Sequence, residues 1–223
     1  MPRLDERLKA VARIIRCDIH MDVGSDHGHL LFALLKSGRV SRGIAIENKQ
    51  RPYLNSRTTL ADVNADVRFG EGLAAANPGE ADSLSICGMG GRSIVRILSE
   101  YPDRVPSQVI LQPNQRIHLV RRWGYENGFT IAGETWVGTD RIFEILHFVR
   151  QTTGDGDFVD PAYEGFDLET AFHFGPTHLR QRAPEFLNRL QEERQYFGQF
   201  PHRQPATEHR LRMIAQILGL DNH

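Results

Sequence analysis

Short hydrophobic runs alternate with segments of helical periodicity from about residue 4 to residue 150. Short apolar runs are typical of buried strands, and apolar positions spaced three and four residues apart indicate helices. The expected strands are 19–22, 42–47, 67–69, 82–87, 109–111, 129–137 and 142–149, and the expected helices are 4–15, 30–35, 53–63, 93–101 and 117–126. This alternation predicts a doubly wound α/β fold. The last two strands have no helix between them, which indicates a hairpin at one edge of a seven-stranded, mostly parallel sheet.

The pattern changes beyond residue 150. Residues 151–157 are polar and rich in glycine, which is typical of a turn or linker. We therefore expect one domain over residues 1–157 and a second region over residues 158–223. Residues 160–176 show no regular period, and helical periodicity returns at 178–197 and 207–218. The two helical segments predict an antiparallel helical hairpin.

Composition limits the possible partners. The chain has 223 residues and a formal net charge of −1, which excludes a uniformly basic nucleic-acid-binding protein. The first helix is locally basic, and it either lies along a phosphate backbone or presents a solvated face. Cys17 and Cys87 lack the paired spacing of a disulfide framework or a zinc site. The charged first helix is unlike a signal peptide and no apolar run is long enough to span a bilayer, so we expect a cytoplasmic protein with no membrane association and no obligate protein partner.

A glycine-containing loop, from Asp22 to Gly28, joins the first expected strand to the helix that follows it. Gly24 and Gly28 allow positive φ angles and a close approach of a ligand to the backbone. In a doubly wound sheet, the turn after the first strand is a place where small ligands bind. The loop therefore predicts a ligand site.

Three carboxylates, Asp22, Asp26 and Glu47, lie at or near the ends of the first two expected strands. The dinucleotide pattern G-x-G-x-x-G is absent, and Asp26 would repel a pyrophosphate. S-adenosylmethionine has no phosphate, and its ammonium, sulfonium and ribose hydroxyls require anions and hydrogen-bond acceptors. The pattern favours this ligand, with a loop acid for its amino-acid end, Glu47 for its ribose and Glu71 for its adenine amine. Alternatively, an acid at a strand end serves only as the N-cap of the next helix.

Two further loops, Gly88–Gly91 and Gln112–Asn114, follow expected strands and face the position of a methyl acceptor. Met89 offers a flexible apolar side chain. Gln112 and Asn114 offer amides that suit the edges of nucleic-acid bases. Alternatively, the glycines only permit a tight turn from strand to helix.

His27 and His29 form an H-x-H pair near a strand end, which is also how some metal hydrolases begin. Such hydrolases usually need a β/α barrel with further ligands at later strand ends, and this chain is short for that barrel. The hydrolase is retained as the less favoured alternative, and we predict no metal site.

Several motifs occur in order along the chain: Asp22-Val-Gly-Ser-Asp-His27, Glu47 with Pro52, Gly70-x-Gly-Leu73, Ile86-x-Gly-Met-Gly-Gly91, Leu111-Gln-Pro-Asn114 and Phe143-Glu144. Together they resemble the bacterial tRNA (adenine-22) N1-methyltransferase family. The resemblance extends from about residue 4 to residue 150 and, more loosely, into the helical tail. It implies a Rossmann-like class I methyltransferase domain with a C-terminal helical hairpin, S-adenosyl-L-methionine as cofactor and tRNA as substrate.

The resemblance and the loop chemistry together give candidate site residues. The catalytic candidates are Asp26, Asn114 and Met89. The cofactor-binding candidates are Asp22, Gly24, Ser25, Asp26, His27, Gly28, Glu47, Asn48, Glu71, Gly72, Gly88 and Met89. The substrate-binding candidates are Gly90, Gln112, Pro113, Asn114, Arg116 and Arg121.

Some positions depart from the family pattern. Glu71 stands where Asp is usual, and Phe143 stands where Tyr is common, so any role of a tyrosine hydroxyl does not carry over to this chain. The helical tail also looks short. Two alternatives therefore remain beside the hydrolase, namely a methyltransferase acting on another substrate and a non-catalytic module that binds the cofactor.

Overall fold

The computed structural model describes residues 4–138, 141–151 and 159–220. The chain divides into two compact units, Met1–Glu164 and Gly165–His223. The boundary expected between residues 157 and 158 lies outside the described residues.

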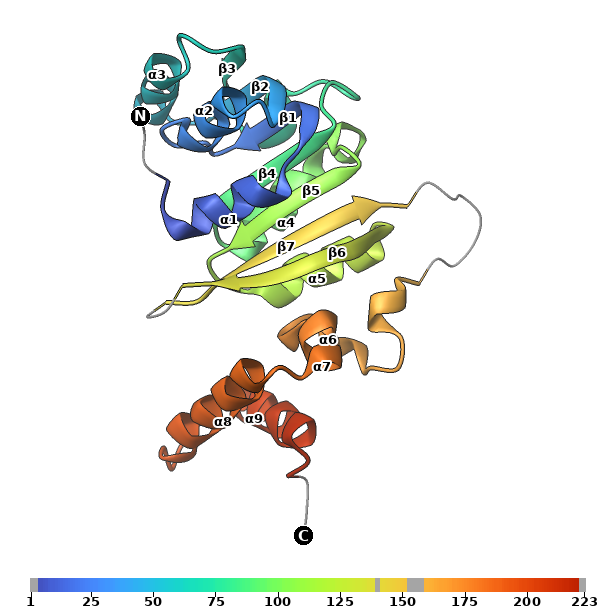
Figure 1. The fold of residues 1–223 in the computed structure, drawn as a ribbon. Helices are drawn as coiled ribbons and strands as arrows, with labels where there is room; N and C mark the ends of the chain where they lie inside the picture. Colours follow the sequence, from blue (N-terminus) through green and yellow to red (C-terminus); the bar gives the residue numbers. More distant parts are fainter. Residues whose placement is uncertain (1–3, 139–140, 152–158, 221–223) are drawn as a thin grey trace. The chain divides into compact units, whose positions relative to one another are not determined.

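A seven-stranded sheet forms the centre of the first unit (Figure 1). Its strands are β1 Cys17–Val23, β2 Val40–Glu47, β3 Ala65–Phe69, β4 Ser83–Met89, β5 Gln108–Pro113, β6 Phe129–Val137 and β7 Phe143–Arg150. They follow the order β3-β2-β1-β4-β5-β7-β6. The five strands from β3 to β5 are parallel, and β7 runs antiparallel to both β5 and β6. The predicted sheet with a hairpin at one edge is thus confirmed.

Helices cover both faces of this sheet (Figure 1). One face carries α1 Glu6–Ile14, α2 His29–Lys36 and α3 Gln50–Thr59, and the other carries α4 Gly91–Glu100 and α5 Ile117–Glu126. Short 3-10 helices occur at η1 Gly72–Ala75, η2 Pro102–Arg104 and η3 Pro161–Tyr163. Alternate residues of β5 point to opposite faces of the sheet. Val109 and Leu111 pack with residues of α4 and α5, whereas Ile110 packs with residues of α1 and α2. The carboxyl ends of the parallel strands are left to loops, where ligands bind in folds of this type.

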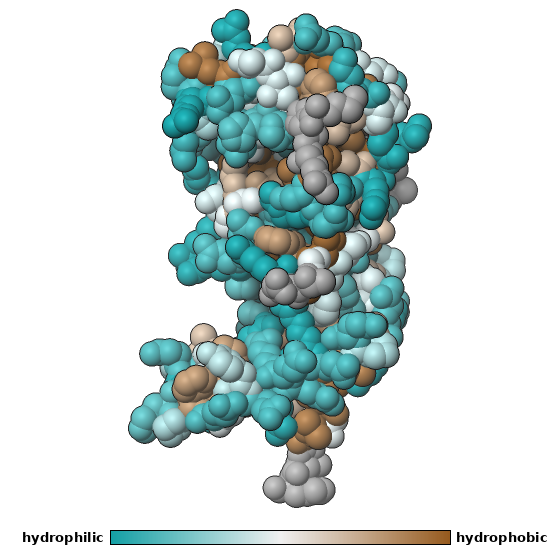
Figure 2. Space-filling view, turned by 60° about the vertical axis from the view of Figure 1, so that its left-hand side comes forward, coloured by the Kyte–Doolittle hydropathy of each residue, from teal (hydrophilic) through white to brown (hydrophobic). Residues whose placement is uncertain are grey.

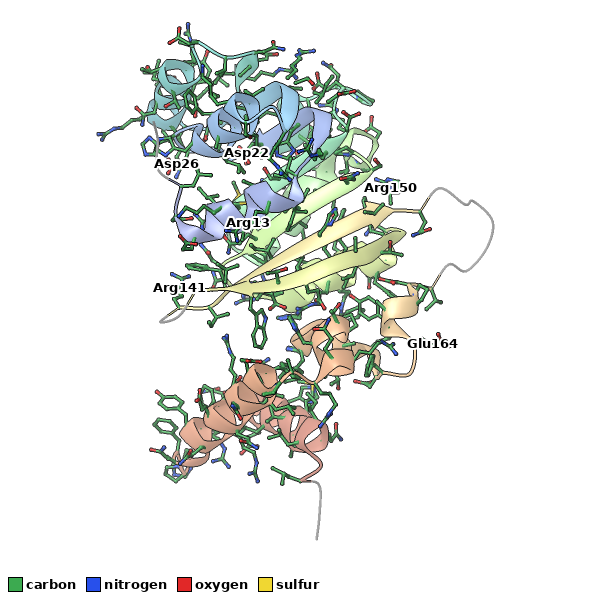
Figure 3. All side chains as sticks on the ribbon, in the orientation of Figure 1. Arg13, Asp22, Asp26, Arg141, Arg150 and Glu164 are labelled. Carbon is green, nitrogen blue, oxygen red and sulfur yellow. The ribbon has the colours of Figure 1, made fainter. Side chains whose placement is uncertain are left out.

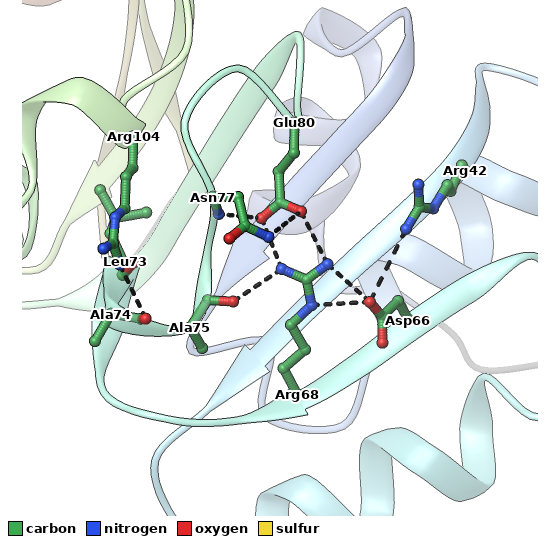
Figure 4. Close-up of polar contacts among 9 residues, drawn as sticks. All are labelled: Arg42, Asp66, Arg68, Leu73, Ala74, Ala75, Asn77, Glu80 and Arg104. Atoms are coloured by element: carbon green, nitrogen blue, oxygen red, sulfur yellow. Dashed lines mark hydrogen bonds and ion pairs between the residues drawn. The ribbon is translucent and has the colours of Figure 1, made fainter.

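Arginine side chains brace the segment between β3 and β4 (Figure 4). Arg68 donates to the carbonyl of Ala75 at 2.8 Å and to the carboxylate of Glu80 at 2.6 and 2.9 Å. Arg104 donates to the carbonyl of Ala74 at 2.9 Å. These bonds satisfy carbonyls of the irregular backbone around η1 and fix the loop that follows the third strand.

Arg121 of α5 is completely buried, and the predicted contact of its side chain with substrate is therefore wrong. Its Nε donates to Glu134 at 2.6 Å, and its Nη2 bonds to Glu144. A buried guanidinium needs such partners because an unpaired charge in the interior is costly. Arg121 thus ties α5 to β6 and β7 instead of facing a ligand.

The second unit consists of helices α6 Leu168–Phe174, α7 Pro176–Gln181, α8 Pro184–Gly198 and α9 Pro205–Leu218 within the described residues. The hairpin of α8 and α9 is antiparallel as predicted: Arg210 of α9 pairs with Glu193 of α8, and Arg182, which precedes α8, donates to the carbonyl of Ile217 near the end of α9.

Two expectations for this unit are wrong. Residues 168–174 are helical, with Asp167 as the N-cap that accepts from the Thr170 amide at 2.8 Å. The single helix expected over 178–197 is divided before Pro184, whose ring disfavours helical backbone in the preceding residue.

Figure 2 shows one face of the surface, coloured by hydropathy. This face is mostly hydrophilic, and its hydrophobic residues appear in separate groups. Within the described ranges, no helix has both the length and the apolar character needed to cross a membrane.

Replacement of Arg121 by alanine should strongly destabilise the first unit. The change leaves Glu134 and Glu144 without their cation, and breaking a buried ion pair typically costs about 3–5 kcal/mol. Urea unfolding of Arg121→Ala would measure this loss. The exposed neighbour Arg122 provides the control, because interactions of an exposed arginine contribute little and Arg122→Ala should change the free energy of unfolding by at most about 1 kcal/mol. Equal stabilities for the two variants would contradict a structural role for the buried ion pairs.

Candidate functional site

A cavity of about 570 Å³ opens at the carboxyl ends of the central strands. Its lining comes from the β1–α2 loop, the ends of β2, β4 and β5, and the facing parts of α1 and β7. The lining residues are Asp5, Arg7, Leu8, Asp22, Gly24, Ser25, Asp26, His27, His29, Leu30, Glu47, Asn48, Lys49, Pro52, Cys87, Gly88, Met89, Asn114, Arg141 and Phe143. The volume lies within the usual range for small-molecule sites.

The β1–α2 loop approaches the end of β4 closely. Gly24 has φ of 73°, and a Cβ atom there would lie only 2.2 Å from Cε of Met89. The positive φ favours glycine at this position, and a larger residue would also have to displace the flexible end of the Met89 side chain. Asp26 has φ of 56°, a conformation that Asp tolerates better than most residues. The predicted role of glycine in this turn thus has a physical basis at Gly24.

The backbone of Asp26 is fixed from two sides, while its side chain is exposed toward the cavity. Its amide donates to Glu47 at the end of β2, and its carbonyl accepts from Ser56 Oγ at 3.0 Å. Figure 3 shows Asp22 and Asp26 near the ends of the first strands. The bond between the Asp26 amide and the Glu47 carboxylate places two of the three predicted acidic residues next to each other.

Glu47 is nearly buried, and burial raises the pKa of its carboxyl to about 7. The Asp26 amide opposes this shift, whereas the neighbouring charges of Asp22 and Asp26 add to it. Glu47 Oε1 accepts the Asp26 amide, and Oε2 has no donor among the described residues. A ligand that donates hydrogen bonds or carries positive charge would favour the ionised carboxylate.

Asp22 ends a chain of buried polar groups between β1 and β4. Ser85 Oγ donates to Asp22, His20 Nε2 lies 2.9 Å from Ser85 Oγ, and His20 Nδ1 lies 2.6 Å from Ser83 Oγ. Burial lowers the pKa of His20 to about 3, so the ring is neutral. Burial also raises the pKa of Asp22, and the Ser85 hydroxyl opposes that rise. These bonds orient the Asp22 carboxylate at the floor of the cavity.

Amide side chains join the ends of β4 and β5. Asn114 Nδ2 donates to the carbonyl of Gly88 at 2.6 Å, and its Oδ1 accepts from Gln112 Nε2 at 3.2 Å. Gln112 Oε1 accepts from Arg7 Nη1 at 2.6 Å and from the Gly88 amide at 3.1 Å. Asn114 reaches the cavity, but Gln112 is completely buried. The predicted contact of Gln112 with a base edge is therefore wrong, because its amide holds the two strand ends and α1 together.

Several other predicted site residues do not line the cavity. Glu71 pairs with Arg96 of α4 at 2.8 Å, and the position of Gly72 is packed closely against Ile97. The remaining residues outside the lining are Gly28, Gly90, Pro113 and Arg116. Their predicted binding roles remain untested, and Gly28 and Gly90 serve here as the N-caps of α2 and α4.

His27 and His29 both line the cavity, and their rings stack with centroids 5.3 Å apart. The part of the chain that the structure describes contains no group of three or more His, Cys, Asp or Glu residues that could hold a metal ion. Within the described residues, the hydrolase alternative thus rests on the two histidines alone.

The sequence did not single out His20, Ser85 or Arg141 as parts of this site, and it placed Arg7 only within the basic first helix. His20 and Ser85 carried a usable signal, since polar side chains at every second position of two otherwise apolar strands indicate a shared polar face. Arg141 had no comparable local signal, and for Arg7 the signal was only the basic character of its helix. Their place at the cavity depends on the packing of α1 and on the β6–β7 hairpin.

Two comparisons of the sequence with known proteins identify related methyltransferases. Residues 4–146 match a family described as "Methyltransferase domain". The tRNA (adenine(22)-N(1))-methyltransferase of Bacillus subtilis strain 168 is 31% identical over 202 residues, covering 87% of this chain and 82% of the relative.

Solved structures show the same fold over nearly the whole chain. The crystal structure of the B. subtilis M1A22 tRNA methyltransferase TrmK has a TM-score of 0.80 at 27% identity, covering 98% of this chain and 97% of that one. A Streptococcus pneumoniae protein solved in complex with S-adenosyl-L-methionine has a TM-score of 0.78 at 27% identity, covering 95% of this chain and 98% of that one. The chain therefore belongs to the TrmK-like tRNA (adenine-22) N1-methyltransferase family of class I S-adenosylmethionine-dependent methyltransferases.

Proposed function

We propose that this methyltransferase transfers a methyl group from S-adenosylmethionine to N1 of adenine 22 in tRNA. The observation that carries the proposal is the group of three carboxylates, Asp22, Asp26 and Glu47, around one cavity at the strand ends. In a chain of this family, such a group suits a cationic cofactor and opposes a phosphorylated dinucleotide. The substrate follows from the B. subtilis relative, which is named for this reaction.

The residues at the cavity fit the cofactor. Ser25 Oγ is buried beside Asp22 and forms no hydrogen bond of normal geometry with any described residue, and its hydroxyl favours the ionised form of Asp22. Glu47 Oε2 is free of described donors and suits the ribose hydroxyls. Asp26 suits the amino-acid end, and Gly24 leaves room for close approach.

Catalysis in this site should depend on alignment and electrostatics. When bound, the cofactor supplies an electrophilic methyl group, and N1 of adenine already carries the lone pair that receives it. No general base is needed before attack, so the protein acts by proximity and by stabilising positive charge. The Asp26 carboxylate either holds the amino-acid end or accepts from the exocyclic amine of the target. Asn114 retains one N–H for the base edge, and Met89 supplies an apolar wall.

N1 lies on the Watson–Crick edge, so the target adenine must be unpaired or extruded before it reacts. The exposed position of Asp26 at the cavity is consistent with a base that enters from outside. Binding of tRNA through phosphate contacts would also make affinity fall steeply with salt.

Mass spectrometry of tRNA nucleosides provides the direct test. Incubation of the protein with S-adenosylmethionine and unmodified tRNA should yield 1-methyladenosine, and a tRNA carrying guanine in place of adenine 22 should yield none. A thermal shift with S-adenosylhomocysteine tests cofactor binding separately, because a ligand of the native state raises stability. Cofactor binding without methylation of tRNA would contradict the assignment of tRNA as the substrate. It would favour a methyltransferase with another substrate or a non-catalytic module that binds the cofactor.

Replacement of Asp26 by asparagine should abolish most methyl transfer while the fold remains intact. Asparagine tolerates the positive φ of this position and keeps the shape of the side chain, but it removes the charge. Loss of one such electrostatic contact typically lowers turnover by about 10²–10³-fold. Single-turnover kinetics measure the loss, with thermal unfolding as the control for stability. Near-normal turnover would remove Asp26 from the mechanism.

Replacement of Glu47 by glutamine should weaken cofactor binding and stabilise the ligand-free protein. The pKa of Glu47 in the folded state is about 7, above its ordinary value, so the free energy of unfolding decreases as pH rises through the interval from the ordinary value to 7. Relative to wild type, the glutamine variant should therefore gain stability between pH 5 and pH 8, on the order of 1–3 kcal/mol. Thermal unfolding at both pH values measures this difference.

Calorimetry with S-adenosylhomocysteine completes the test of Glu47. Wild-type affinity should fall as pH decreases from 8 to 6, because the ionised carboxylate accepts hydrogen bonds more strongly. Glu47→Gln should bind more weakly at pH 8 and show a smaller dependence on pH. Unchanged affinity in this variant would contradict the assignment of Glu47 to the ribose.

A further inference from the structure

The two sides of the cavity differ in their charged groups. Asp22, Asp26 and Glu47 lie at the ends of β1 and β2, accompanied by Lys49. The side formed by α1 and the start of β7, with the segment that precedes it, carries two guanidinium groups next to one aromatic ring, together with the Asp5 carboxylate. The Arg141 guanidinium lies 4.9 Å from the centroid of the Phe143 ring, and that of Arg7 lies 5.7 Å from it.

Arg7 is held firmly in place. Asp5 caps α1 by accepting from the Leu8 amide at 2.7 Å, which fixes the first turn of the helix. Arg7 Nη1 then donates to the buried Gln112 at 2.6 Å, and Nη2 lies 3.5 Å from Asp5. The guanidinium is therefore oriented by β5 as well as by its own helix.

Arg141 has its donors available. A Cβ atom at Gly138, which has φ of 107°, would lie 2.2 Å from the carbonyl oxygen of Arg141, so only glycine permits this close approach before β7. Arg141 is exposed, lines the cavity and has no carboxylate partner among the described residues (Figure 3). A guanidinium that stacks on a ring keeps its N–H edge free, and that edge matches the oxygens of a phosphate.

We propose that Arg7, Phe143 and Arg141 form the subsite for the phosphate backbone of the acceptor nucleotide. This inference rests on the proposed function, since it requires an RNA acceptor. Arg141 binds a phosphate next to the target adenine, Arg7 contributes a second fixed positive charge, and Phe143 aligns both guanidinium groups.

The excess of carboxylates on one side and of guanidinium groups on the other would also separate the two substrates. The guanidinium groups repel a cationic cofactor and attract polyanionic RNA, whereas the carboxylates have the reverse effect. A base that enters the cavity leaves its phosphates nearer the mouth, so cations there bind the backbone without contacting the reacting atoms. The subsite should therefore influence RNA binding much more than the chemical step.

The test compares Arg141→Gln with Arg57→Gln. Arg57 of α3 is also exposed, and its guanidinium lies 5.7 Å from the centroid of the Tyr53 ring, but it lies outside the cavity. Both substitutions remove one positive charge and one cation–π contact. For Arg141→Gln we expect the KM for tRNA to rise about 5–10-fold with kcat changed less than about twofold, and the slope of log affinity against log salt to decrease by about one. Arg57→Gln should match wild type in each measurement.

A second variant and the affinity for S-adenosylhomocysteine distinguish failure of the subsite from failure of the proposed function. Phe143→Leu removes the ring and should also raise the KM for tRNA, and neither cavity variant should alter the affinity for S-adenosylhomocysteine more than about twofold. Equal effects of Arg57→Gln and Arg141→Gln, a loss confined to kcat, or a loss of S-adenosylhomocysteine affinity would each overturn the subsite. If wild type binds the cofactor but does not methylate tRNA, the proposed function itself fails. If wild type methylates tRNA and Arg141→Gln is normal, only the subsite fails.

Discussion

The site depends on the desolvation of two carboxylates at adjacent strand ends. Asp22 and Glu47 are both nearly buried, and Asp26 adds a third acid close by. Their mutual repulsion and their burial both disfavour the ionised forms. The Ser85 and Ser25 hydroxyls and the Arg7 charge oppose this effect at Asp22, and the Asp26 amide and the Lys49 charge oppose it at Glu47. The ligand-free protein thus holds acids whose charge a cationic ligand would stabilise.

The rest of the first unit maintains that arrangement. The parallel pairing of β1 with β2 and β4 brings their carboxyl ends to one edge, and Gly24 lets the loop approach Met89. Buried polar groups then join neighbouring elements, as Gln112 joins Arg7 to Gly88 and Arg121 joins α5 to β6 and β7. Because each group needs its partners, these networks restrict how the strand ends can move.

Sequence patterns predicted the fold well because its strands are short apolar runs in regular alternation with helices. They also placed Asp22, Asp26 and Glu47 at one site, since parallel strand ends meet at one edge of a sheet. They failed where a side chain has a partner distant in sequence. Arg121 looked like a free helical cation, but β6 and β7 supply Glu134 and Glu144. Gln112 looked like a free amide for the same reason, and Arg7 lies 105 residues away from it.

The chain of polar groups between β1 and β4 has a consequence for strand pairing. His20 is opposite Ser83 and Asp22 is opposite Ser85 in the parallel ladder, so the side-chain hydrogen bonds follow the backbone register. A shift by one or two residues would leave a histidine or a carboxylate buried without a partner, at substantial cost. Two strands with apolar side chains on both faces would distinguish only weakly between these registers. The polar groups at the centre of the sheet thus select one alignment of two strands that the chain must bring together across two intervening βα units.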